Sequence, residues 1–151
     1  MAFVPHKEKI TKPKTENTAS FFNEEEAIKN VIIYETDAFS NQDMKAWADS
    51  FIQDANTMVL QAFTDGKQSV LGFENMKAGM EAYFKENPGY KFNVTTRKDW
   101  RIAVDGTTAR AYFLQEANDD NGTYVSDEFR VLEKVDGQWK IAVVVSIFKT
   151  E

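Results

Sequence analysis

Apolar side chains recur along the chain with two different periods. Between residues 24 and 86 most of them return every three or four positions, which is the spacing of one helix face. From residue 90 to residue 149 they return every second position, as in a strand with one buried face, and two short stretches at 56–63 and 67–71 flank an Asp-Gly turn. The pattern predicts helices together with a run of long strands.

Three helices are predicted. The first starts at Ser20 or Asn23, has glutamates at 24–26 near the positive end of its dipole, and runs to about Ser40. The second is capped by Asp43. Their apolar stripes are Ala27, Ile28, Val31, Ile32, Ala38 and Phe39 for the first, Met44, Trp47, Ala48 and Phe51 for the second, and Phe73, Met76, Met80, Tyr83 and Phe84 for the third.

Four Asp-Gly or Asn-Gly pairs separate the alternating stretches, and such pairs are a strong signal of β-hairpins. The predicted strands are 56–63, 67–71, 90–104, 107–118, 123–135 and 138–149. Helices combined with an antiparallel meander indicate an α+β domain with its helices on one face of the sheet. Alternation from Tyr90 places Arg97, Arg101 and Arg110, with Glu116, on the outer face.

Composition removes several classes of function. The net charge of −6 and the pI near 4.9 repel double-stranded nucleic acid, and no basic stripe offsets this field. The chain has no cysteine, which excludes disulfides, thiolate metal sites and cysteine nucleophiles. No apolar run approaches the ~18 residues of a membrane span. We expect neither a nucleic-acid partner nor a membrane span.

Residues 1–20 show no periodicity and contain Pro5 and Pro13, so we predict a flexible N-terminal arm ahead of a domain at 21–151. No basic region followed by an apolar one is visible at the start, which makes a cytoplasmic location the default expectation. The same polar stretch resembles a tether left after removal of an export signal, so an exported form stays open.

Four features occur in an order that is typical of a known fold. They are the corner Ala38-Phe39-Ser40-Asn41-Gln42-Asp43, the segment Trp47–Ala55, Gly72 before the third helix, and the final hairpin segments Asp127–Val131 and Val135–Ile141. In this order and spacing the chain resembles the nuclear transport factor 2-like superfamily, and within it the SnoaL-like group, over residues 24–149.

The resemblance implies a strongly curved antiparallel sheet wrapped as a cone around three helices, as in a cystatin-like α+β barrel. It also implies an apolar pocket inside the cone and a homodimer formed through the outer face of the sheet. Members include ketosteroid isomerase, scytalone dehydratase, polyketide cyclases and transport adaptors, so the fold does not specify an activity.

Asp127 lies two residues after Val125 and two residues before Phe129, and this spacing predicts that it shares their inward apolar face with Val131. Desolvation there would raise its pKa and keep it protonated as a hydrogen-bond donor. The segment resembles the one that carries such a neutral acid in ketosteroid isomerase. The alternative is a structural aspartate that is bonded to a backbone N–H, a tyrosine or an arginine.

Glu35 falls near the middle of the apolar stripe of the first helix, where a lone carboxylate is costly. It should be paired, protonated or open to a wet pocket. Rotation out of the core and a bond to an indole N–H are the alternatives. By resemblance, Glu35 and its neighbour Tyr34 stand where isomerase-like members carry an oxyanion tyrosine.

The chain departs from catalytic members of the superfamily in two places. The strand 56–63 holds the Gln61 amide instead of a carboxylate base, and the only histidine, His6, lies in the arm. Three functions stay open. The first is a domain that binds a small apolar or amphipathic molecule. The second is a cofactor-free isomerase, cyclase or dehydratase that uses Asp127 and Glu35 on a ketone or polyketide-like substrate. The third is a non-catalytic dimerisation or assembly domain.

We expect a pocket lined by one amide and several aromatic side chains. The predicted ligand-binding residues are Tyr34, Gln61, Trp47, Tyr83, Phe92, Trp100 and Phe113. The sequence has no phosphate-cradling loop, nucleophile elbow or dinucleotide motif, so no cofactor is expected. Metals that need imidazole or thiolate have no donors in the domain, and Asp119-Asp120-Asn121 fits a hairpin loop better than a calcium loop.

Overall fold

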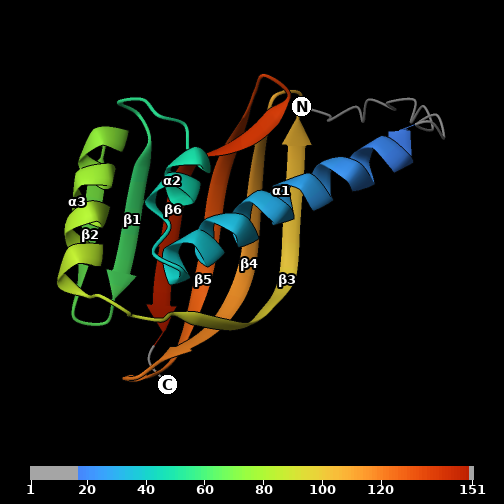
Figure 1. Cartoon of the computed structure of the whole chain (residues 1–151). Coiled ribbons are helices and arrows are strands. Elements are labelled where there is room, and N and C mark those ends of the chain that lie inside the picture. Colours follow the sequence, from blue (N-terminus) through green and yellow to red (C-terminus); the bar gives the residue numbers. More distant parts are fainter. Residues whose placement is uncertain (1–16, 150–151) are drawn as a thin grey trace, which may run out of the picture.

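The computed structural model describes residues 17–149, with side chains from Asn23 onward. Three helices and six strands follow one another in this part of the chain (Figure 1). They are α1 (Asn17–Ser40), α2 (Met44–Asp49), β1 (Met58–Phe63), β2 (Gly66–Leu71), α3 (Phe73–Glu86), β3 (Asn93–Asp105), β4 (Thr108–Asp119), β5 (Gly122–Val135) and β6 (Gln138–Lys149). The predicted α+β class and the order of elements are confirmed.

The long helix α1 crosses the concave face of the sheet (Figure 1). Its residues Ile28 and Ile32, which are one turn apart, are fully buried. Glu24 forms an ion pair with Lys134 and accepts a hydrogen bond from the indole of Trp139, which ties α1 to the β5–β6 hairpin. The helix begins at residue 17, so the caps predicted at 20 and 23 lie inside it, and the rest of the predicted arm lies outside the described residues.

The boundaries of the two shorter helices lie where local chemistry predicts them. The carboxylate of Asp43 accepts a hydrogen bond of 2.9 Å from the backbone N–H of Ala46, which confirms it as the cap of α2. Gly72 precedes α3 with a φ of 89°, a region that favours glycine, and α3 ends at Asn87. Within residues 17–149 no helix has the length and apolar character needed to cross a bilayer.

The sheet is open and mixed rather than wholly antiparallel. Its strand order is β2-β1-β6-β5-β4-β3, and the pairs are antiparallel except β1 with β6, which run parallel. The predicted hairpins are confirmed; at Asp136 and Gly137 both φ angles are positive, as a two-residue hairpin turn requires. The prediction of a wholly antiparallel sheet is wrong for the pair β1 and β6. The pattern of apolar residues shows which face of a strand is buried, but it does not show with which strand it pairs.

Two β-bulges in β3 change which of its side chains face inward. The register against β4 skips one residue at Thr95 and again beside Asp99. Each extra residue reverses the alternation, so the two cancel beyond residue 100. Trp100 therefore faces the core as predicted, but between the bulges Thr96 is exposed and Arg97 turns inward. The prediction of an outer position for Arg97 is wrong for this reason.

The hydrophobic core fills the space between the helices and the concave face of the sheet. Its buried members are Ile28, Ile32, Ala38, Trp47, Phe51, Phe73, Met76, Ala109, Ala111, Phe113, Leu132, Trp139, Ile141 and Val144. Apart from Phe51, which follows α2, they come from α1, α2, α3, β4, β5 and β6, so the core joins all the described helices to the middle strands. The charged cluster described next interrupts it.

The second bulge offers a test of how β3 is built. Asp99 has a φ of 59°, in the left-handed region, where a residue other than glycine is strained by about 1–2 kcal/mol. We expect Asp99→Gly to raise the free energy of unfolding by about 0.5 kcal/mol, since relief of strain exceeds the entropy lost with glycine. Asp99→Val should lower it by about 1 kcal/mol or more.

Urea denaturation measures both effects. Asp105→Gly, at the exposed end of the same strand, is the control and should lose about 0.5–1 kcal/mol, because φ there is not positive. Equal losses for glycine at residues 99 and 105 would contradict this account of the bulge.

Candidate functional site

The concave face of the sheet changes in character along the strands. One end is aromatic, with Tyr124 of β5 beside Phe148 of β6, and the other is apolar, with Leu132 and Ile141 of the same strands. Buried polar side chains lie between the two ends: Gln115, Ser126, Glu128, Arg130 and Ser146. We call Glu35, Arg97, Gln115, Glu128 and Arg130 the concave cluster.

Strand register gathers these polar side chains. Glu128 of β5 pairs with Ser146 of β6, which pairs in turn with Gln61 of β1. In the neighbouring row, Gln115 of β4 pairs with Arg97 of β3. Residues that are paired directly across strands point to the same face of a sheet. Gln61, predicted as a ligand-binding residue, therefore shares the concave face with Glu128.

Glu128 is the most enclosed charged side chain, with 1% of its surface exposed. One carboxylate oxygen accepts a hydrogen bond of 2.6 Å from Ser126 Oγ. The other accepts 2.8 Å bonds from Ser146 Oγ and Arg130 Nη1. A buried carboxylate is tolerated only when it is paired in this way, so these three donors explain why Glu128 can stand in the interior.

The two arginines of the cluster are only partly used. Arg130, 4% exposed, donates through Nη1 to Glu128 and to two backbone carbonyl oxygens. Arg97 donates through Nε to Gln115 Oε1 at 3.1 Å. Within the described part of the chain, Arg97 Nη2 and Arg130 Nε are the two buried side-chain N or O atoms without a hydrogen-bond partner. Both are donors without an acceptor.

Glu35 reaches the same region from α1. Burial raises the pKa of its carboxyl group, and the guanidinium groups of Arg130 and Arg97 and a hydrogen bond from Trp47 offset this only in part. The hydroxyl of Thr36 lies 3.5 Å from Glu35 Oε2 but donates more closely, at 3.1 Å, to a backbone carbonyl oxygen. Of the sequence alternatives, the structure favours desolvation, with the indole of Trp47 close enough to lower the pKa in part.

Asp127 lies on the opposite, outer face of the sheet. It accepts a hydrogen bond of 2.9 Å from Tyr112 Oη and forms an ion pair of 3.0 Å with Lys149. Partial burial favours a higher pKa, but these two interactions outweigh it and hold the pKa of Asp127 below its ordinary value. The predicted inward position of Asp127 and the predicted rise of its pKa are both wrong. The adjacent Glu128 is the acid that faces inward.

Other predicted residues form the surroundings of the cluster. Phe113 is fully buried; Trp100 stacks on it at 4.2 Å, and the guanidinium of Arg130 lies 5.6 Å from its ring centre. Tyr83 and Phe92 each lie about 6 Å from the ring of Phe39. Trp47 packs within the core, and its indole lies near Glu35.

Successive ring contacts join the aromatic residues at one end of the concave face. This aromatic end consists of Phe39, Phe63, Tyr83, Phe84, Tyr90, Phe92, Tyr124 and Phe148. The hydroxyls of Tyr90 and Tyr124 both donate to the carboxylate of Asp119, at 2.8 and 3.1 Å. Phe63 is exposed and the other rings are half-buried, so the aromatic end is partly open to solvent.

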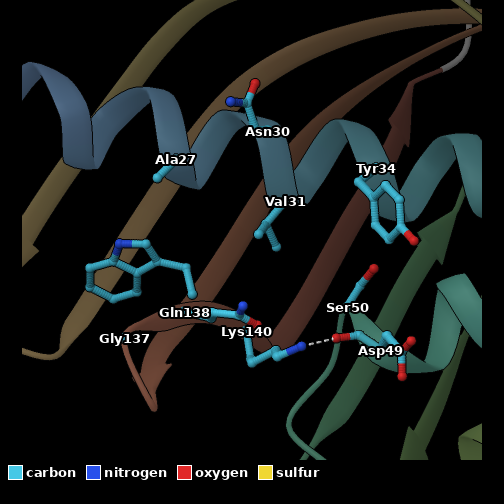
Figure 2. Close-up of a pocket in the computed structure, with 10 residues that line it drawn as sticks. Ala27, Asn30, Val31, Tyr34, Asp49, Ser50, Gly137, Gln138 and Lys140 are labelled. Carbon is cyan, nitrogen blue, oxygen red and sulfur yellow. Dashed lines mark hydrogen bonds between the residues drawn. The ribbon is translucent and has the colours of Figure 1, made fainter.

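Tyr34 lies apart from this site. It is 53% exposed and lines a groove of about 690 Å³ between α1, the end of α2 and the β5–β6 turn (Figure 2). Lys140 Nζ donates to the backbone carbonyl of Asp49 across this groove. The predicted grouping of Tyr34 with Gln61 is therefore wrong, because the two lie in different places.

The sequence reasoning missed Glu128, Arg130 and the inward position of Arg97. One signal was present: an acid and a base two residues apart on a strand share a face and can form an ion pair. For Arg97 no such signal exists, because its direction depends on the two bulges. Among the described residues the structure contains no group of three or more His, Cys, Asp or Glu side chains placed to hold a metal.

Comparison with known proteins places the fold. No protein-family model matches the chain, and no curated protein matches its sequence. Solved structures do match. A protein of Novosphingobium aromaticivorans, provisionally named a scytalone dehydratase, is 18% identical with a TM-score of 0.68, covering 88% of this chain and 89% of that one.

Two further structures have no assigned function. A nuclear transport factor 2-like protein of Pseudomonas putida is 14% identical with a TM-score of 0.67, and 86% of this chain and 89% of that one are covered. A Nostoc punctiforme protein with a cystatin-like fold is 11% identical with a TM-score of 0.64, and 84% and 92% are covered. The chain therefore has the nuclear transport factor 2-like, cystatin-like α+β fold.

Proposed function

We propose that this protein binds a small amphipathic molecule on the concave side of its sheet. The polar part of the ligand would meet the concave cluster, and its apolar part would lie among the rings of the aromatic end. The observation that carries this proposal is the pair of buried, unpartnered N–H groups on Arg97 and Arg130.

Stability alone gives little reason for such a cluster. A buried ion pair is often no more stabilising than apolar residues of the same volume. A buried donor left without an acceptor costs about 1–3 kcal/mol. Two such donors, held by rigid strands beside the ion pair of Arg130 with Glu128, favour a role in recognition over a role in folding.

The cluster also revises the expected ligand. An entirely apolar molecule would leave the N–H groups of both arginines without an acceptor, whereas a molecule with a polar head and an aromatic or aliphatic body matches both zones. Catalysis by the predicted pair is not supported, because Asp127 faces outward and only Glu35 reaches the interior. Turnover of a ketone would therefore have to use Glu35.

The outer face of the sheet supports a homodimer as the second part of the proposal. One row of paired residues across it reads Leu60, Val145, Phe129 and Tyr112. The described helices lie on the other side of the sheet (Figure 1), so no helix among residues 17–149 covers this apolar row. A second copy of the chain offers the same surface, as the two-fold interfaces of most homodimers require.

Binding can be tested by titrating the protein with naphthol, naphthamide and naphthoate and recording the chemical shifts of its backbone amides by NMR. We expect shifts at Gln61, Ser126 and Ser146, which lie along the concave face. Gln115→Leu should weaken binding about tenfold by removing a polar group from the site. The matched control, Leu114→Gln, changes the neighbouring residue on the outer face and should leave affinity within about twofold.

Two results would overturn the proposal. One is the absence of any shift at the concave residues at saturating probe. The other is a set of shifts confined to Asn30, Tyr34 and Gln138, which would move the binding site to the groove beside α1.

Glu35 gives a pH-dependent prediction. Its pKa is raised above the ordinary 4.5, so its protonated form is favoured in the folded protein. The contribution of the neutral Glu35 carboxyl group to the free energy of unfolding is fully present below pH 4.5. It is lost as the pH rises through the raised pKa. Relative to Glu35→Gln, the wild type should lose about 1.4 kcal/mol for each pH unit between those two values.

Thermal and urea denaturation of both proteins between acid and neutral pH measures the difference. Glu81→Gln, on the exposed surface of α3, is the control and should follow the wild type at every pH. Parallel curves for wild type and Glu35→Gln would show that the carboxyl group titrates as it does in water.

The homodimer is tested by mass in solution. Analytical ultracentrifugation should give twice the chain mass of 17.3 kDa. Phe129→Lys, at the centre of the outer face, should produce monomers that keep the wild-type circular dichroism, while Glu133→Lys at the margin of the same face should leave the dimer intact. A wild-type monomer, or a Phe129→Lys dimer, would refute this interface.

A further inference from the structure

The unpartnered N–H donors of the concave cluster determine which groups of a ligand they can bind. A guanidinium group has five N–H donors and no acceptor, so its free N–H groups can be satisfied only by an acceptor atom. The acceptors of Gln115 and Glu128 are already engaged. Gln115 Oε1 accepts from Arg97 Nε, and both oxygens of Glu128 accept from Ser126, Ser146 or Arg130.

The two guanidinium groups determine which ligand group the cluster favours. Arg97 and Arg130 lie beside one fully engaged carboxylate, Glu128. Two further acids, Asp37 and Glu35, act on Arg97 electrostatically, and burial raises the pKa of Glu35. None of these carboxyl groups accepts a hydrogen bond from Arg97 Nη2 or Arg130 Nε. An anionic acceptor on a ligand would supply the missing hydrogen bonds.

We propose that the concave cluster receives the carboxylate of a small organic acid, which accepts hydrogen bonds from Arg97 Nη2 and Arg130 Nε. This inference rests on the proposed function, since it names the class of the amphipathic ligand. Guanidinium groups bind carboxylates through charge-assisted hydrogen bonds that are about twice as strong as neutral ones. The aromatic end, reached along β5 from Ser126 to Tyr124, takes the apolar body of the acid.

A matched pair of probes tests the charge separately from the binding. Naphthoate and naphthamide have the same ring system and nearly the same shape, but only naphthoate is an anion. At neutral pH we expect the wild type to bind naphthoate about tenfold or more tightly than naphthamide by isothermal titration calorimetry. Arg97→Gln should abolish the preference while leaving the affinity for naphthamide within about threefold.

Two further variants complete the design. Arg130→Met would leave Glu128 without its cation and can fail to fold, so Arg130→Lys is used instead; it keeps the charge but lacks the Nε donor, and it should reduce the preference for naphthoate. Arg110→Gln, exposed on the outer face, is the matched control for loss of one positive charge and should leave the preference unchanged.

The outcomes separate the two proposals. Equal binding of naphthoate and naphthamide by the wild type would overturn the carboxylate inference and leave the binding function standing, with water satisfying the two donors. An undiminished preference in Arg97→Gln would also overturn it. Failure of both probes to bind would overturn the binding function and this inference together.

Discussion

A carboxylate held away from water in the middle of the sheet is the constraint on which the concave side depends. Glu128 requires donors from several directions, and it finds them along its own strand in Ser126 and Arg130 and across the ladder in Ser146. Removing one partner of a buried ion pair typically costs about 3–5 kcal/mol. Because strands rather than loops supply these partners, the cluster is as rigid as the sheet.

That constraint also explains why the cluster carries surplus donors. The fork of Arg130 satisfies Glu128 through one nitrogen, so its Nε remains free. A guanidinium stays protonated when buried and presents its N–H groups in one plane, which a lysine ammonium does not. The bulges of β3 then bring Arg97 to the same face. Structure and charge together leave two positive donors that no acceptor among residues 17–149 satisfies.

Features that depend on neighbours in sequence were predictable, and features that depend on pairing were not. The cap at Asp43 and the turn at Asp136 and Gly137 follow from local chemistry, so the sequence was sufficient to locate them. The parallel pairing of β1 with β6 and the inward turn of Arg97 depend on register, which no residue of β1 or β3 encodes alone. The fold was therefore more predictable than the site.

The error at Asp127 has a more specific cause. A strand with one wet face shows which of its faces is buried, but β5 carries apolar side chains on both: Val125, Phe129 and Val131 outward, and Leu132 inward. Apolar residues on both faces are typical of a strand that is covered on both sides. The described helices cover one side only, and the second copy proposed above would cover the other. The pattern that obscured the inward acid is thus the same pattern that argues for a second chain on the outer face.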